Sequence, residues 1–194
     1  SAAEYADSLG VDIINSSLGY HDFDDANTNH KYWEQDGETA LISHTASMCA
    51  DKGIICVNSA GNDGMGVWKK INFPADAKNI LTVGSINEQG KNAAFSAVGP
   101  TADGRIKPDV MAYGSPTSVI TGRGAIINDN GTSFSSPLIA GMTACLWQAL
   151  PHKTAKQIIK LVKMAGNNQL HPDNIYGYGV PDFWKAYQTG KAIK

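Results

Sequence analysis

The stretch 130–141 limits what this chain can fold into more than any other part of it, and its sequence is Asn-Gly-Thr-Ser-Phe-Ser-Ser-Pro-Leu-Ile-Ala-Gly. It predicts a tight turn that leads into a helix, because Gly131 permits the turn and Thr132 or Ser133 can cap the apolar helix that follows. We expect Pro137 in the first turn of that helix, where its missing N–H is harmless.

A serine at such a helix start suits nucleophilic chemistry. Its hydroxyl lies beside unpaired backbone N–H groups and the positive end of the helix dipole, which favour a reaction that generates an oxyanion. The commoner role of a Thr-Ser pair before an apolar run is a simple N-cap. The Gly-x-Ser-x-Gly elbow of the α/β-hydrolases does not fit, because it requires glycine where this chain has Ser135 and an acid between Ser133 and His171, where there is none.

Composition excludes several classes of protein. The chain has 194 residues with 42% hydrophobic content, enough for one domain or a large piece of one. Its 16 basic and 18 acidic residues give no field that would attract nucleic acid or an anionic membrane, and no apolar run is long enough to span a bilayer. The three cysteines, Cys49, Cys56 and Cys145, lie in apolar periodic segments and are predicted to be buried thiols.

Alternating helical and strand patterns predict an α/β fold with a parallel sheet. Helices are expected at 1–9, 39–52, from 133 through Trp147, at 154–166 and at 183–187, strands at 11–18, 53–60 and 79–85, and a hairpin at 119–130. The polar segment 20–37 is predicted to be a loop insertion without a metal site, although it contains His and Asp residues. His44 is expected to be a surface or packed residue of a covering helix.

A second candidate site follows the strand at 53–60. Open α/β sheets bind ligands at the carboxyl ends of their strands, which is where Gly61 and Asn62 lie. The Asn62 amide is a neutral donor that can stabilise a developing negative charge, while an ordinary turn is the structural alternative for Gly-Asn-Asp-Gly.

Several motifs together resemble the subtilisin-like serine proteases, the subtilases. Gly-Thr-Ser-x-Ser-Ser-Pro with the following Ala-Gly resembles their nucleophile motif, which implies that Ser133 is the nucleophile. Ala-Gly-Asn at 60–62 resembles the segment that supplies the oxyanion amide, which assigns that role to Asn62. Asn-x-Ser-Leu-Gly at 15–19 resembles the strand that pairs with substrate, and Lys-Pro-Asp-Val-x-Ala at 107–112 matches a further family segment.

The resemblance implies a three-layer subtilisin-like fold, with a mostly parallel sheet covered by helices. The whole chain, 1–194, is interpreted as the C-terminal portion of one catalytic domain that is incomplete at its N-terminal side. The resemblance also implies a substrate site, made of Ser17, Leu18, Gly19, Ser59, Ala60, Gly61, Asn72 and Thr132. It assigns Asp63, Asn72 and Tyr20 to the border of the first specificity pocket, and it predicts a cis peptide at Phe73-Pro74.

Two members of the subtilase triad have no counterpart in the sequence. The family's Asp and His segments precede the Asn-x-Ser-Leu-Gly strand, and only ten residues precede Val11 here. We therefore expect the general base and its partner upstream of this chain, and negligible peptide hydrolysis by the chain alone. Two alternatives stay open, namely a pseudoprotease or peptide-binding module that keeps the groove, and a different hydrolase with His44 or His171 as base.

The expected partners are a peptide or protein substrate and the missing N-terminal part of the same domain, with no nucleic acid and no membrane segment. No cofactor is predicted, and although the resemblance allows calcium, no calcium site can be identified in the sequence. The family resemblance also implies a secreted or cell-envelope location.

Overall fold

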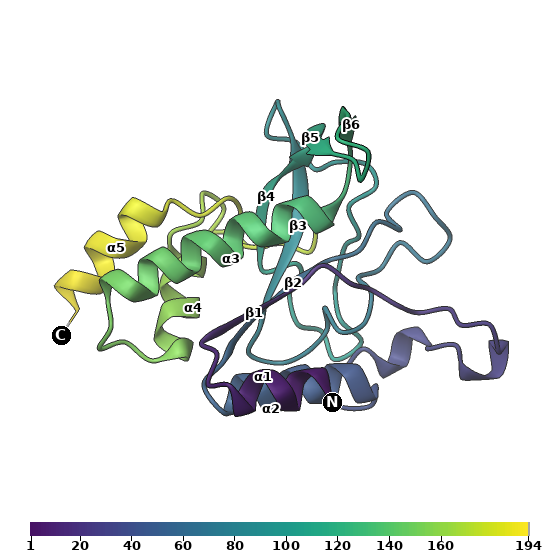
Figure 1. Ribbon diagram of the computed structural model, residues 1–194, viewed down its shortest axis with the longest axis horizontal. Coiled ribbons are helices and arrows are strands. Elements are labelled where there is room, and N and C mark those ends of the chain that lie inside the picture. Colours follow the sequence, from purple (N-terminus) through teal and green to yellow (C-terminus); the bar gives the residue numbers. More distant parts are fainter. Residues whose placement is uncertain (194) are drawn as a thin grey trace.

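The computed structural model describes residues 1–193 and has a four-stranded parallel sheet at its centre (Figure 1). The strands lie side by side in the order in which they occur along the chain, and each pairs in parallel with the next. They are β1 (Ile13–Ser16), β2 (Ile55–Ser59), β3 (Leu81–Asn87) and β4 (Val110–Ser115). Ser16 pairs with Asn58, so the carboxyl ends of β1 and β2 meet at one edge of the sheet.

Helices cover both faces of this sheet. One face carries α1 (Ala2–Ser8) and α2 (Leu41–Asp51), and the other carries α3 (Thr132–Ala149), α4 (Ala155–Met164) and α5 (Phe183–Ala192) (Figure 1). In β2, Ile55 and Val57 pack into the core under α3 and α4, whereas Cys56 between them packs with Cys49 and Ala50 of α2. This alternation is typical of a strand buried on both faces, and it confirms the predicted three-layer α/β architecture.

The start of α3 differs from the sequence prediction in two respects. Neither Thr132 nor Ser133 is the cap, because the N-cap is Gly131, which has no side chain to bond, and Thr132 is the first helical residue. Pro137 lies in the second turn instead of the first, so the carbonyl of Ser133 lacks its usual helical donor. The hydroxyl of Ser17 donates to that carbonyl at 2.9 Å. A distant residue therefore compensates for the interior proline.

The segment 20–37 is a loop, as predicted, with two short 3-10 turns at Ala26–Thr28 and Tyr32–Glu34. Tyr20 and Phe73 exchange two backbone hydrogen bonds, of 3.0 and 3.1 Å, at its start. The ring of His30 lies 4.5 Å from the ring of Phe73. These contacts hold the loop against the segment that follows β2, near the carboxyl edge of the sheet.

Three smaller predictions have mixed outcomes. The Phe73-Pro74 peptide is cis, as predicted. Cys49 and Cys56 are buried as expected, but the prediction for Cys145 is wrong, because it lies on the outer face of α3 and is exposed. His44 lies on the surface of α2, where its Nδ1 is 2.8 Å from Glu38.

A hairpin of β5 (Thr117–Ile120) and β6 (Ile126–Asp129) carries the chain from β4 to α3, in agreement with the predicted hairpin. All four residues of β6 are exposed. Within residues 1–193, no helix combines the length and the apolar character that crossing a membrane requires.

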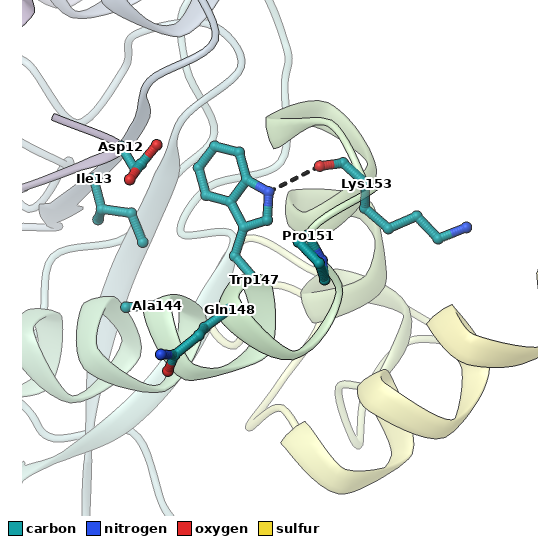
Figure 2. A pocket seen from close by; sticks show the side chains of 7 residues that line it. All are labelled: Asp12, Ile13, Ala144, Trp147, Gln148, Pro151 and Lys153. Atoms are coloured by element: carbon teal, nitrogen blue, oxygen red, sulfur yellow. Dashed lines mark hydrogen bonds between the residues drawn. The ribbon is translucent and has the colours of Figure 1, made fainter. Parts of the chain in front are cut away.

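β1 is an edge strand of the sheet, and a hollow of about 580 Å³ lies beside it (Figure 2). The hollow separates the start of β1 from the last turns of α3, and its lining consists of Asp12, Ile13, Ala144, Trp147, Gln148, Pro151 and Lys153. The indole of Trp147 lines the hollow and is held by a hydrogen bond of 2.8 Å from Nε1 to the carbonyl of Lys153.

Candidate active site

Ser133 lies where the amino end of α3 meets the carboxyl end of β1. It is the second residue of the helix and is partly exposed. Its Oγ donates to the carbonyl of Ser17 at 3.3 Å, while the Ser17 hydroxyl donates to the carbonyl of Ser133 at 2.9 Å. These reciprocal bonds join two segments that are 116 positions apart in sequence, and they fix the start of the helix against the end of the strand.

The side chain of Asn62 caps α3 from outside the helix. Its Oδ1 accepts hydrogen bonds from the backbone N–H of Thr132 at 3.0 Å and from the Thr132 hydroxyl at 2.9 Å. A backbone N–H can only donate, so the oxygen of the amide must face the helix and the Nδ2 group must face away. Nδ2 lies 3.6 Å from the position that a Cβ on Gly131 would occupy. Asn62 is exposed, and within residues 1–193 no hydrogen bond uses its Nδ2 donors, which lie near the start of α3.

Asn72 fills the space between two neighbouring glycines. A Cβ on Gly19 would lie 2.9 Å from the Cβ of Asn72, and a Cβ on Gly61 would lie 2.9 Å from its Cγ. Gly61 also has a φ of +109°, which strains any other residue. The Nδ2 of Asn72 donates to Asp63 Oδ2 at 2.7 Å. The structure therefore brings Asp63 and Asn72 together with the glycines that the sequence assigned to the substrate site.

Ala60 and Gly61 can line a substrate site but cannot pair with an added strand through their backbone. The N–H of Ala60 donates to Val83 at 2.9 Å, and its carbonyl accepts from the N–H of Asn72 at 2.9 Å. The N–H of Gly61 donates to the Thr132 hydroxyl at 3.2 Å, and its carbonyl accepts another backbone N–H at 3.0 Å. Because these backbone groups are already paired, they are not free to bind an added strand.

In the segment 17–19, in contrast, backbone N–H groups are unpaired. Among the hydrogen bonds of residues 1–193, none pairs the backbone N–H of Leu18 or Gly19. Leu18 and Gly19 are exposed. Unpaired donors on an exposed extended segment are what an added peptide strand requires.

The two histidines near this edge, His21 and His30, lie close to carboxylates. The ring of His21 stacks on Trp68 at 4.5 Å, with its Nε2 3.7 Å from Asp63, and His30 Nδ1 lies 3.0 Å from Glu34. In the part of the chain that the structure describes, no hydrogen bond joins an imidazole to Ser133.

Comparison with known proteins identifies the family. The sequence model of the subtilase family matches residues 1–179. This chain belongs to the subtilase family. It is 31% identical over 98% of its length to the subtilisin-like protease SBT6.1 of Arabidopsis thaliana, and 30% identical over its whole length to the membrane-bound transcription factor site-1 protease of Homo sapiens. It spans only 18% of the length of each of these relatives.

Shorter relatives and solved structures agree with this membership. The subtilase chain is 30% identical to subtilisin DY of Bacillus licheniformis over 97% of its length, and it spans 61% of that protein. All of it superposes on the prenylagaramide maturation protease PagA with a TM-score of 0.76 and 20% identity, covering 66% of that structure. It also superposes on MycP1 of Mycobacterium smegmatis with a TM-score of 0.71 and 24% identity. That match covers 96% of this chain and 53% of the MycP1 structure. These structural matches show the shared fold.

Two further serines, to which local sequence gave no role, bind the start of α3 to the sheet. The hydroxyl of Ser135 donates to the carbonyl of Ala112 in β4 at 3.0 Å, and the hydroxyl of Ser136 donates to Asn15 Oδ1 in β1 at 2.8 Å. A Cβ on Gly114 would lie 2.3 Å from Ser135 Oγ, so glycine is required there. The signal was present in the serine-rich motif, but its strand partners could not be identified from local sequence.

Proposed function

We propose that this chain carries the nucleophile and an oxyanion donor of a serine peptidase that cleaves peptide or protein substrates. Ser133 Oγ attacks the carbonyl carbon of the scissile bond, its proton passes to a general base, and the carbonyl oxygen becomes an oxyanion that accepts from Asn62 Nδ2. The base then protonates the leaving amine, and water hydrolyses the acyl-enzyme. The observation that carries this proposal is the orientation of Asn62, whose oxygen accepts from Thr132, so that its Nδ2 donors point away from Thr132 at the start of the helix that bears Ser133.

Substrate binds in this proposal as an added strand along segment 17–19. The unpaired N–H groups of Leu18 and Gly19 donate to the substrate backbone, and Ser59, Ala60 and Gly61 form the facing wall. Thr132 acts indirectly, because its N–H and hydroxyl hold the Asn62 amide in place.

The proposal further assigns the general base and its aspartate to a part of the parent domain that precedes Ser1. A serine hydroxyl is a weak nucleophile without an adjacent base, and the hydrogen bond donated by Ser133 Oγ goes to a backbone carbonyl. The open edge of β1 and the hollow beside Trp147 support a further strand and helix packing there (Figure 2). The chain alone is then inactive, and the fold is completed by its own parent sequence.

The substitution Asn62→Asp in the parent protease separates the two functions of this side chain. An aspartate oxygen can still cap α3 by accepting from Thr132, but the carboxylate has no donor and repels an oxyanion. We expect kcat to fall by about a hundredfold to a thousandfold or more, with little change in the free energy of unfolding. Steady-state kinetics on a peptide substrate and urea unfolding measure the two quantities.

Asn62→Ala is the matched variant, because it removes both the cap and the donor. It should lose activity to a similar extent and also lose about 1 kcal/mol of stability. A variant Asn62→Asp that folds normally and keeps near wild-type kcat would overturn the oxyanion assignment.

A further inference from the structure

A second charged site lies at the opposite edge of the sheet. A cavity of about 320 Å³ opens beside the amino ends of β3 and β4 and is bordered by α4. Its charged lining consists of Arg105, Lys107, Asp109 and Lys163. Ser133 lies at the carboxyl edge of the sheet, so this cavity is separate from the proposed catalytic site.

Positive charge predominates in this cavity. Three cationic side chains face a single carboxylate, that of Asp109, which leaves two formal positive charges. Asp103 forms an ion pair of 2.8 Å with Arg105 Nε, and one positive charge remains when this carboxylate is included. The carboxyl of Asp76, which is outside the lining, also interacts with Lys107, but burial raises its pKa and so favours its neutral form. An excess of positive charge inside a partly enclosed cavity favours an anionic ligand.

The one lining carboxylate already accepts three hydrogen bonds, on about four acceptor sites. Asp109 Oδ2 accepts from Lys107 Nζ at 2.6 Å and from the backbone N–H of Thr82 at 2.9 Å, while Oδ1 accepts from Lys163 Nζ at 2.8 Å. Burial alone would raise the pKa of Asp109, but Lys107 and Lys163 lower it to about 2. This carboxylate is therefore ionised, and both of its oxygens accept hydrogen bonds.

In contrast, two cationic side chains of the cavity have hydrogen-bond donors that no acceptor within residues 1–193 uses. The Nη2 atom of Arg105 has no hydrogen-bond partner within residues 1–193 and almost no accessible surface, so an anion reaches it only after a small movement of the partly exposed guanidinium. Lys163 Nζ carries three donors, of which one goes to Asp109, and it lies 4.5 Å above the ring of Tyr178. Burial lowers the pKa of Lys107, and the neighbouring charges of Lys163 and Arg105 lower it further. An anion would satisfy the free donors and relieve this repulsion among the cations.

We propose that this cavity binds one small inorganic oxyanion of the phosphate or sulfate type. The planar guanidinium of Arg105 and the ammonium of Lys163 donate to its oxygens, and the buried Lys107 supplies a third positive charge. The ligand stabilises the junction of α4 with the start of β4, at a distance from proteolytic chemistry. The proposal does not depend on the function of Ser133.

Isothermal titration calorimetry of the 194-residue chain with inorganic phosphate, at constant ionic strength maintained with sodium chloride, tests this proposal. We expect saturable binding of one phosphate per chain. Arg105→Gln should weaken the affinity by about tenfold or more, because it removes a charged donor. Arg123→Gln is the matched control, since Arg123 lies exposed in the hairpin turn, and it should leave the affinity unchanged.

Absence of saturable phosphate binding by the wild-type chain would overturn the proposal. Equal affinities of the wild-type and Arg105→Gln chains would do the same. If circular dichroism shows that Arg105→Gln is unfolded, Arg105→Lys replaces it as the test. That variant keeps the positive charge but lacks the Nη2 donor, and it should also bind phosphate more weakly than the wild-type chain.

Discussion

Replacement of Ser133 with alanine in the parent protein is expected, under the proposed function, to lower kcat by about a millionfold, the typical cost of removing the serine of a catalytic triad. The reason is chemical, since no other atom can form the acyl-enzyme once Oγ is absent. The fold should tolerate the change, because the lost bond to Ser17 is a long one of 3.3 Å, and the shorter bond from Ser17 Oγ to the Ser133 carbonyl uses the backbone. Steady-state hydrolysis of a peptide substrate measures the effect.

Ser118→Ala is the control for that experiment. Ser118 lies exposed in β5, and among the residues that the structure describes its hydroxyl bonds only to Asn128, at 3.2 Å. It should leave kcat unchanged. A Ser133→Ala enzyme that folds and retains more than about a tenth of wild-type activity would exclude Ser133 as the nucleophile.

Among the variants considered, Asp109→Asn is expected to lose the most stability, about 3–5 kcal/mol in the free energy of unfolding. Asp109 and Lys107 are each only 3% exposed, and the substitution leaves the Lys107 ammonium buried without its counter-charge. It also breaks the ion pair of 2.8 Å with Lys163. Urea unfolding of the variant and the wild-type chain at neutral pH measures the difference.

Asp51→Asn is the matched control, because Asp51 pairs with Lys156 at 3.4 Å on the surface, where both side chains are more than 60% exposed. Such a pair contributes about 0–1 kcal/mol. A loss below about 1 kcal/mol for Asp109→Asn would show that the buried ion pairs do not stabilise the fold.

Acid should lower the free energy of unfolding of the wild-type chain, because it protonates the Asp109 carboxylate. Its pKa is about 2 in the folded state and near 3.9 when unfolded, so the unfolded state binds more protons in this range. The stabilisation is fully present above about pH 4 and is lost as the pH falls through about 2. The urea midpoint of Asp109→Asn should lack this part of the acid dependence.

The sequence predicted the elements that local patterns determine. Helix periodicity located α2 and α4, and the continuous apolar run at 53–60 located β2. The neighbourhood of Ser133 and Asn62 was also predicted, because motif order combined with the strand-end rule places both at one edge of a parallel sheet. The hydrogen bonds from Thr132 to Asn62 agree with that prediction.

The details that failed depend on partners distant in sequence. β4, at Val110–Ser115, was not predicted as a strand, because only Val110 is β-branched and burial between β3 and α3 determines its conformation. The carbonyl that Pro137 leaves without a helical donor accepts from Ser17, and the cap of α3 comes from Asn62. Local propensity contains no information on such contacts.

Labelling with a fluorophosphonate probe tests the central claim most directly. The probe reacts with a serine only when a base activates its hydroxyl. We predict background labelling of the 194-residue chain alone, and strong labelling at Ser133 in the parent protein or when its preceding segment is added in trans. Strong labelling of the chain alone would mean that one of its own histidines is the base, and a folded parent protein that stays unlabelled would indicate a peptide-binding module without catalysis.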